Sequence, residues 1–335
     1  MKNNWDVIVI GGGIIGLSIA WALRKRGATV LVVERGEPGL EASYAAAGML
    51  ADTPIELPAA LHELARASAQ MYPGFVHEIE DESGTKVDLR DQGTIFLSGE
   101  ERLPLASLEP ALVDQPAVFF KERSVDPRAL GVAMLKAAKH RGVDIATGSN
   151  VTGVFYGGVD TEKTRYYGAK VVNCAGAWAG QVGPVPFPTR PVKGQMLALV
   201  GPRELVRHVV RWHGGYLVPR SDGRIVVGST LEEAGFDKRV DVETIRGLHQ
   251  AALRHVPRLA ECRILEDWAG LRPATPDGLP LLGATSVPGY FVAGGHFRDG
   301  ILLTPVTAAV MASVISGEKP GFDLSAFAAG RFAGS

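Results

Sequence analysis

The sequence predicts an α/β protein made of two units. The first unit is built around a parallel sheet, and the second is an α+β unit around a large mixed or antiparallel sheet. Two observations predict this. Near the N-terminus a strand, a glycine-rich turn, a helix and a second strand follow one another, whereas the middle of the chain carries shorter alternating segments broken by turns. With 335 residues, 46% of them hydrophobic, the chain is long enough for two ordinary units.

Charge and cysteine content restrict the function classes. The chain has 35 basic and 36 acidic residues and no concentrated basic stretch, which argues against a nucleic-acid-binding surface. Two cysteines, Cys174 and Cys262, are too few for a disulfide framework and fit a reducing compartment. The longest apolar tracts, 14–23 and 301–315, are interrupted and shorter than the ~20 residues of a membrane span, and no signal peptide is evident. We therefore expect a cytoplasmic protein without a membrane span.

The first unit opens with a buried strand at 6–10. A G-x-G-x-x-G pattern at Gly11, Gly13 and Gly16 follows at once and leads into a helix that ends near Gly27. A second apolar strand then ends at Glu34, 18 residues beyond Gly16. This spacing is typical of a Rossmann-like dinucleotide site, with the acid binding ribose hydroxyls.

Each residue type in this motif has a physical role. Glycines permit the tight turn and let the backbone approach a pyrophosphate, and the helix N-terminus presents free N–H groups and a positive dipole end to that anion. The motif predicts a dinucleotide that contains ADP. It leaves open whether that cofactor is a flavin or a nicotinamide nucleotide.

Later segments return to each unit in turn. The first unit continues with a helix capped near Asp126, a strand running into a turn at Gly176, a strand at 289–296 and a buried helix ending at Gly317. Alternating segments, the hairpin turn 221–224 and an amphipathic helix at 242–259 belong to an antiparallel region. The predicted domains are 1–82, 124–184 and 262–335 for the cofactor unit, and 83–123 and 185–261 for the substrate unit.

Seven stretches together resemble the FAD-dependent D-amino-acid oxidase superfamily over nearly the whole chain. Within it the sequence is most similar to the glycine oxidases of thiamine biosynthesis, although sarcosine oxidases and D-amino-acid dehydrogenases share most of these blocks. The stretches are VIVIGGGIIGLSIAWAL (7–23), EASYAAAGML (41–50), VVNCAGAWAG (171–180), RPVKGQMLAL (190–199), GGYLVPRSDGRIVVGST (214–230), WAGLRPATPDGLPLLG (268–283) and GGHFRDGILLTP (294–305). The segment between 95–100 and 125–130 is shorter than is usual for the family, which bears on substrate size and access.

The resemblance implies non-covalent FAD, held between the two units. It implies that the turn at 294–300 passes along the isoalloxazine and that the next helix directs its N-terminus at the pyrimidine end of the ring. The residues it implies for cofactor binding are Gly11, Gly13, Ile14, Ile15, Gly16, Glu34, Arg35, Ser43, Ala46, Ala47, Gly48, Met49, Val151, Ala175, Gly176, Trp178, Gly270, Arg272, His296, Phe297, Arg298, Asp299, Gly300 and Ile301.

The resemblance also implies a binding site for a substrate carboxylate. Arg272 matches the family's carboxylate-binding arginine, whose planar fork suits two oxygens. Tyr216 matches the tyrosine that supports the same carboxylate, and Arg298 lies by the flavin. Taken alone, Arg272 before a proline is typical of a surface loop, Tyr216 of an ordinary strand, and Arg298 of an ion pair within its loop.

No catalytic base stands out, and the chemistry does not require one. A neutral amine can pass its α-hydrogen as hydride to flavin N5, so the protein supplies positioning while the cofactor carries the reaction. The imine product is hydrolysed to an oxo acid. His296 and His213 are possible bases, but a structural or flavin-side histidine is the favoured interpretation of His296. The eight histidines and two cysteines show no metal-ligand spacing, so no metal is expected.

The leading hypothesis is oxidation of glycine, sarcosine or D-alanine-like substrates with O₂ reduced to H₂O₂. The alternatives are a D-amino-acid dehydrogenase that reduces a quinone or another carrier, a non-catalytic FAD-binding subunit of a larger complex, and an NAD-dependent dehydrogenase. Both Arg272 and Tyr216 argue against a non-catalytic subunit. The sequence leaves open the exact substrate, the electron acceptor and the oligomeric state, a homo-oligomer included.

Overall fold

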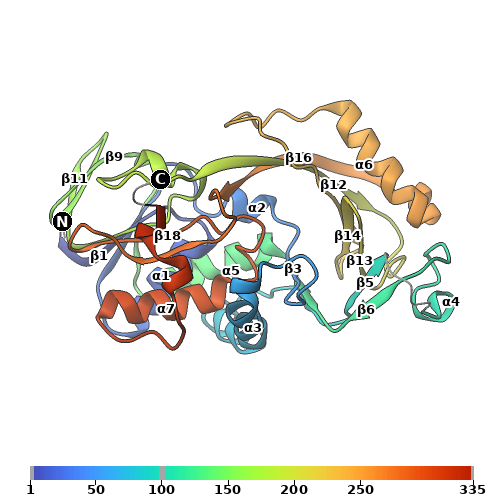
Figure 1. Ribbon diagram of the computed structural model, residues 1–335, viewed down its shortest axis with the longest axis horizontal. Coiled ribbons are helices and arrows are strands. Elements are labelled where there is room, and N and C mark those ends of the chain that lie inside the picture. Colours follow the sequence, from blue (N-terminus) through green and yellow to red (C-terminus); the bar gives the residue numbers. More distant parts are fainter. Residues whose placement is uncertain (1–3, 98–102, 333–335) are drawn as a thin grey trace.

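The protein folds into two units side by side, each around its own large sheet (Figure 1). The structure is a computed structural model that describes residues 4–97 and 103–332. An eight-stranded sheet lies in one unit and a seven-stranded sheet in the other, with a three-stranded sheet formed by β3 (Met49–Leu50), β7 (Arg123–Val125) and β4 (Leu89–Arg90). The predicted α/β class with an α+β second unit is confirmed.

The eight-stranded sheet has a central parallel portion. β1 pairs in parallel with β2 on one side and with β11 on the other, and β11 pairs in parallel with β18. β1 and β2 are almost wholly apolar and buried, as expected of strands covered on both faces. The spatial order is β17 (Leu281–Ala284), β18 (Tyr290–Gly294), β11 (Arg165–Asn173), β1 (Asn4–Ile10), β2 (Val30–Val33) and β8 (Asp144–Ala146), with β10 (Gly158–Thr161) and β9 (Val151–Phe155) added beside β11.

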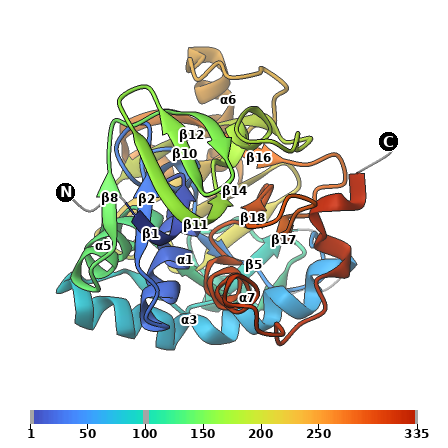
Figure 2. The same ribbon diagram turned by 90° about the vertical axis from the view of Figure 1, so that its left-hand side faces the viewer.

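Four helices cover one face of this sheet (Figure 2). They are α1 (Ile14–Lys25), α3 (His62–Ser83), α5 (Pro127–His140) and α7 (Thr304–Ser316). The Asp126 side chain accepts hydrogen bonds from the backbone N–H groups of Arg128 and Ala129, so it caps α5 as predicted. α7 ends at Gly317, whose φ of 81° suits a residue without a side chain. The helix α3, with Pro73 inside it, was not identified from the sequence.

The seven-stranded sheet forms the core of the second unit. Its spatial order is β16 (Arg263–Ala274), β12 (Arg190–Val200), β15 (Arg224–Gly228), β14 (Gly215–Pro219), β13 (Val209–Trp212), β5 (Thr94–Leu97) and β6 (Val118–Phe120). All pairs are antiparallel except β13 with β5. Leu197 and Leu199 of β12 pack on α6 (Val242–His255), which lies on the outer face of the sheet (Figure 1). The helix expected at 242–259 therefore stops earlier, since Pro257 follows it and starts a separate 3-10 turn.

Two long strands run from one unit towards the other. β12 and β16 pair along nearly their whole length, from Arg190 opposite Ala274 to Val200 opposite Arg263. β16 lies in the range 262–335 assigned to the cofactor unit, yet it belongs to the sheet of the second unit. The division into domains at those boundaries stays a prediction. Residues 98–102 of the shortened segment lie outside the described residues.

Candidate functional site

A large cavity runs between the two units. Its volume is about 1250 Å³, above the roughly 300–1,000 Å³ of an ordinary small-molecule site. Its walls come from the turn after β1, the residues from the end of β2 to β3, the turn after β18, and the inner face of the seven-stranded sheet. The cavity thus has room for a dinucleotide and, beside it, a small substrate.

Glycines shape the end of the cavity at α1. Gly11 has a φ of 103°, and a Cβ there would lie 2.5 Å from the Cys174 carbonyl oxygen. A Cβ on Gly16 would lie 2.1 Å from the carbonyl oxygen of Gly11, so only glycine lets α1 start so close to the turn. The Ser43 hydroxyl accepts a hydrogen bond from the Ile14 N–H at 3.0 Å. This is the N-terminus at which a pyrophosphate would be held.

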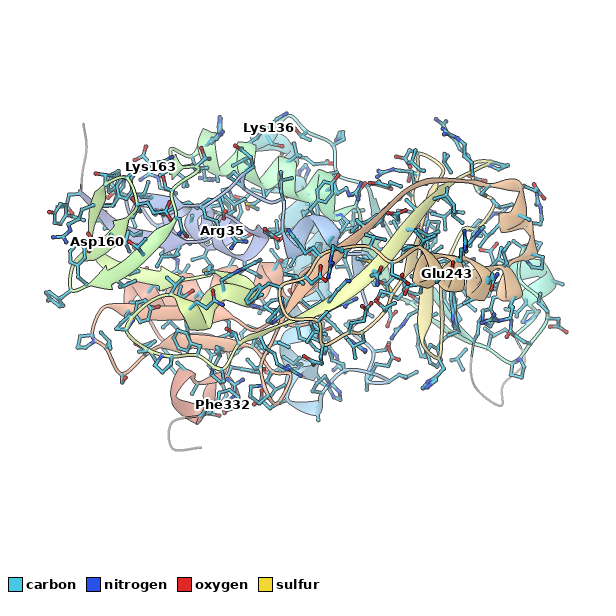
Figure 3. The ribbon with its side chains drawn as sticks, turned by 90° about the horizontal axis from the view of Figure 1, so that it is seen from above. Arg35, Lys136, Asp160, Lys163, Glu243 and Phe332 are labelled. Atoms are coloured by element: carbon cyan, nitrogen blue, oxygen red, sulfur yellow. The ribbon has the colours of Figure 1, made fainter. Side chains whose placement is uncertain are left out.

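Glu34 lies at the ribose position of this motif. Its carboxylate accepts hydrogen bonds from the Gly12 N–H at 2.7 Å and the Gly36 N–H at 2.8 Å. The next residue, Arg35, places its guanidinium 3.5 Å from the centroid of the Trp178 ring. Figure 3 shows Arg35 in the first unit and Glu243 of α6 in the opposite half of the molecule.

A strap from the second unit reaches the same place. We define the strap as residues 231–240, between β15 and α6. Within it, Phe236 stacks on Trp178 with ring centroids 5.0 Å apart, and Lys238 Nζ lies 3.1 Å from Glu41 Oε2. Glu41 also pairs with Arg35 at 2.9 Å. The strap therefore packs against the side of the cavity next to Glu34.

Glycines also admit close packing at the middle of the cavity. Gly48 has a φ of 77°, and a Cβ there would lie 2.0 Å from the Val125 carbonyl oxygen. A Cβ on Gly270 would lie 2.4 Å from the Ala45 side chain. The small-residue segment 43–49 is thereby held close to β16, where it lines the cavity.

Arg272 extends along the inner face of the seven-stranded sheet. Its guanidinium donates to the Ser229 hydroxyl at 2.6 Å and to the Thr230 carbonyl at 3.2 Å. A Cβ on Gly194 would lie 2.2 Å from Arg272 Nη1, so the glycine makes room for the guanidinium. Burial lowers the pKa of Arg272, while the neighbouring Tyr216 acts in the opposite direction. Within the described residues, Arg272 forms no ion pair with a carboxylate, so its charge faces the cavity without a direct counter-ion.

Tyr216 and Arg298 complete this end of the cavity. The Tyr216 hydroxyl lies 3.4 Å from Met196 Sδ and beside the Arg272 guanidinium. Arg298 is exposed, with its guanidinium 5.5 Å from the Phe297 ring centroid, and it forms no ion pair with any described residue. Phe297 has a φ of 48°, and its N–H donates to the Pro273 carbonyl at 2.8 Å. The predicted carboxylate-binding residues therefore line one region of the cavity.

Comparison with known proteins decides the family. Residues 6–314 match the family described as DAO, FAD dependent oxidoreductase. The chain belongs to this family. It is 30% identical to a glycine oxidase of Geobacillus kaustophilus over 100% of the chain and 99% of that protein. It is 31% identical to the hydrogen cyanide synthase subunit HcnC of Pseudomonas aeruginosa over 99% of the chain and 97% of that protein. A crystal structure of glycine oxidase from Geobacillus kaustophilus has a TM-score of 0.94, with 29% identity and coverage of 99% and 100%.

A third relative is a longer protein. The chain is 34% identical to the bifunctional protein ThiO/ThiG of Trichormus variabilis over 98% of the chain, which spans only 55% of that protein. These matches make the chain an FAD-dependent oxidoreductase of glycine-oxidase-like type. The predicted superfamily, enzyme class and cofactor are confirmed.

The residues of this DAO-family enzyme fit FAD. The glycine cradle, the N-terminus of α1 and Glu34 suit the ADP portion, and the turn 294–300 and the segment 43–49 line the cavity where the ring system would lie. His296 is buried, shares a 3.1 Å hydrogen bond with the Thr307 hydroxyl of α7, and has its pKa lowered to about 4 by burial. A histidine that is neutral and fixed to a helix suits a flavin-side structural role.

Asp299 is the unusual acid of the site. Burial raises its pKa to about 6, against the lowering effect of Arg298 and Arg211, and Glu56 adds to the rise. Its carboxyl group therefore changes charge close to neutral pH. The same residue lies two positions before Ile301 in the turn that leads into α7.

The cavity brings together the predicted site residues almost completely. Every residue predicted for cofactor or substrate lines it except Gly16, which packs behind it against Gly11. His213 is exposed in the β13–β14 turn and does not line the cavity. Sequence reasoning missed Glu56, Arg211, Ser229 and Thr230, which also lie there. A signal for Arg211 was present, because the two-residue turn after Trp212 makes it the cross-strand neighbour of Tyr216.

The described residues contain neither a membrane-spanning helix nor a metal-binding cluster. No helix in 4–97 or 103–332 is long and apolar enough to cross a membrane. Over those same ranges, no group of three or more His, Cys, Asp or Glu side chains is placed to hold a metal ion.

Proposed function

We propose that this enzyme oxidises glycine or a similarly small amino acid or secondary amine, such as sarcosine or D-alanine, with FAD held non-covalently. The observation that carries the proposal is Arg272, a partly buried guanidinium that faces the cavity without a carboxylate partner among the described residues. Such a group in a cofactor-binding cavity suits the carboxylate of an amino acid, because a planar fork binds two oxygens at once.

The chain's own residues would position the substrate. Arg272 would bind the carboxylate, the Tyr216 hydroxyl would donate to it, and Ser229 would keep the guanidinium oriented. Arg298 would add positive charge at the cavity wall. This arrangement would hold the α-carbon against the segment where the turn 294–300 and residues 43–49 meet.

The reaction transfers two electrons and needs no protein base. FAD held by these residues would supply the two-electron oxidation: the substrate's α-hydrogen would leave with its electron pair to flavin N5, and O₂ as the final acceptor would be reduced to H₂O₂. The amine, deprotonated before the step, would become an iminium ion, which gives up a proton to leave the imine. Water would then hydrolyse the imine to an oxo acid and ammonia, or to an oxo acid and a primary amine when the substrate is a secondary amine such as sarcosine. His296 remains a neutral group bonded to Thr307, which agrees with a step that calls for no general base there.

The relatives support the substrate class without identifying the substrate. Similar proteins include enzymes named glycine oxidase, a ThiO/ThiG protein and a hydrogen cyanide synthase subunit. A dehydrogenase that reduces a quinone or another carrier uses the same substrate residues. The electron acceptor is therefore a separate question from the substrate.

The test is an anaerobic titration of the FAD-loaded protein with glycine, sarcosine, D-alanine and D-proline. We expect at least one of these amines to bleach the flavin absorbance, and the rates to rank the substrates. Readmitted air separates an oxidase, which recovers its colour rapidly, from a dehydrogenase. A fully loaded protein that none of the four amines reduces would refute the proposed substrate class.

A further inference from the structure

A third arginine, Arg211, lies on the same sheet face as the proposed carboxylate site. Arg211 of β13 is directly opposite Tyr216 of β14, and Tyr216 is opposite Gly228 of β15. Side chains directly opposite in neighbouring strands share a face and lie about 4.5–5.5 Å apart at Cβ. Arg211 therefore continues the row in which Tyr216 lies, one strand further from Arg272, and it lines the same cavity.

Arg211 is buried, and the buried acidic residue Glu122 lies beside it. It is 7% exposed, and its Nη1 lies 3.8 Å from Oε2 of Glu122, which is also buried. Glu122 receives a hydrogen bond from the Thr53 hydroxyl through its other oxygen, while its Oε2 has no hydrogen-bond partner in the described structure. Glu122 is thus fixed behind Arg211 and balances its charge without a direct hydrogen bond.

The direct partner of Arg211 comes from an exposed loop. Arg211 Nη2 donates a short hydrogen bond to the carboxylate of Glu56, which lies between β3 and α3. The Glu56 side chain is 45% exposed, whereas that of Arg211 is only 9% exposed. Glu56 also lines the cavity. A carboxylate from a loop therefore covers a guanidinium that would otherwise face the cavity.

Another cation lies within electrostatic reach. Arg298 and Asp299, in the turn after β18, line the same cavity as Arg211 and Glu56, and the charges of Arg298, Arg211 and Glu56 all influence the pKa of Asp299. Arg298 forms no ion pair with any described residue. A second ligand carboxylate would need cationic groups of this kind, and the cavity offers the Arg211 guanidinium, covered by Glu56, and the uncovered guanidinium of Arg298.

We propose that Arg211, together with Arg298, forms a second carboxylate-binding site, and that Glu56 occupies it and so excludes amino acids that carry two carboxylates. Glu56 supplies the negative charge that a second ligand carboxylate would supply. To reach Arg211, the second carboxylate of a dicarboxylic ligand must displace the carboxylate of Glu56. Both groups are negative, so their repulsion disfavours binding. A ligand with one carboxylate uses Arg272 alone and meets neither obstacle. This inference rests on the proposed function and names the residues that set its substrate class.

The test compares ligands with one and two carboxylates. The FAD-loaded enzyme and its Glu56→Gln variant are titrated at pH 8, above the pKa of about 6 of Asp299, with acetate, malonate, succinate and glutarate. Binding is followed by perturbation of the flavin spectrum, which requires no turnover. We expect Glu56→Gln to strengthen the binding of at least one dicarboxylate by roughly tenfold relative to acetate. The chain length that gains most reports the separation of the two cationic sites.

Two variants show whether the gain belongs to Arg211. The double variant Glu56→Gln/Arg211→Lys keeps a cation beside Glu122 but loses the planar fork, so most of the gain should disappear. Glu318→Gln removes another exposed glutamate that pairs with an arginine, Arg26, on the surface, and it should leave every ratio unchanged. Glu56→Ala serves as a second exposing variant if Glu56→Gln loads FAD poorly.

The second carboxylate site and the proposed function can be refuted independently of each other. If Glu56→Gln and Glu56→Ala leave the dicarboxylate-to-acetate ratio at the wild-type value for all three lengths, the second site is refuted. A gain that survives intact in the double variant also refutes it. If small amines fail to reduce the wild-type flavin, the proposed function fails, while the binding ratios still report on Arg211.

Discussion

The position of the Arg272 side chain depends on a glycine in the neighbouring strand. Gly194 on the adjacent strand has no side chain, and the guanidinium occupies the space that a Cβ would fill, 2.2 Å from Nη1. Ser229 and Thr230 then fix its orientation from the end of β15. The residue that the sequence suggested as a substrate ligand thus depends on a glycine 78 positions earlier in the chain, across one strand pair.

Arg272→Ala should weaken the binding of monocarboxylate ligands and amino-acid substrates strongly while FAD stays bound. Removing one partner of a buried, hydrogen-bonded charge pair costs about 2–5 kcal/mol. Substrate KM, and the Kd of acetate from flavin spectra, measure the loss. Arg272→Lys keeps the positive charge but loses the planar guanidinium, so its ligand affinity should lie between those of the wild type and Arg272→Ala. Unchanged ligand affinity in Arg272→Ala would remove this residue from the substrate site.

Asp299 predicts a pH dependence near pH 6. Burial raises the pKa of this acid to about 6, so its carboxyl group is neutral below that pH and negative above it. Its negative form competes for Arg298 and repels a substrate carboxylate, so ligand binding should weaken as the pH rises through 6. His296, with a pKa lowered to about 4, stays neutral throughout this window.

The measurement is the Kd of glycolate between pH 5 and pH 8. We expect a step in wild-type protein and a flat profile in Asp299→Asn, which keeps the size of the side chain and removes the charge. The same step in both proteins would assign the dependence to another group.

At the scale of elements, the turn between β1 and α1 depends on close backbone packing. Gly16→Ala would place a Cβ 2.1 Å from the Gly11 carbonyl oxygen and 3.2 Å from Val9 Cγ1. Because neither the Gly11 carbonyl group nor the buried Val9 side chain can yield freely, we expect destabilisation of about 1–3 kcal/mol, with weaker FAD binding. Thermal unfolding with and without added FAD measures both effects.

Gly247→Ala in α6 is the matched control. Apart from its chain neighbours and the backbone of its own helix, no described atom lies within 4 Å of a Cβ at this position, so alanine should stabilise the protein by about 0.5–1 kcal/mol. If both alanine variants shift the melting temperature in the same direction, the close approach of Gly16 to the Gly11 carbonyl group does not determine the stability of the fold.

At the scale of the whole molecule, the strap joins the two units across the cavity. Phe236 stacks on Trp178, which in turn lies against Arg35, and Lys238 pairs with Glu41. We expect Phe236→Ala to accelerate FAD release by about two- to tenfold, because an aromatic pair contributes roughly 0.5–1.5 kcal/mol. The increase in fluorescence as the flavin leaves the diluted protein gives the rate.

Tyr156→Ala is the control for this prediction, since Tyr156 is 91% exposed and lies in the β9–β10 turn, away from the cavity lining. Its release rate should equal that of wild type. Equal rates in Phe236→Ala as well would mean that the strap does not retain the cofactor.

The sequence alone determined the elements whose signals are local. β1 ends in the apolar run 7–10 and β2 is apolar throughout, α5 has a capping aspartate and an N-terminal proline, and α7 ends at a glycine. The glycine motif and Glu34 belong to one strand–helix–strand unit, so their spacing predicts the cofactor site. Resemblance then identified Arg272, Tyr216 and the flavin-side residues, nearly all of which line one cavity.

Only the tertiary structure decided what depends on distant partners. α3 was missed because Pro73 breaks its local signal, while its buried face, including Tyr72, is defined by packing against the other helices of the first unit. The pairing of Arg211 with Glu56 joins a strand to a loop 155 residues away, and the strap reaches Trp178 across the gap between units. Propensity and spacing act within a few residues, whereas ion pairs and the rise in the pKa of Asp299 depend on where the folded chain removes water and places charge.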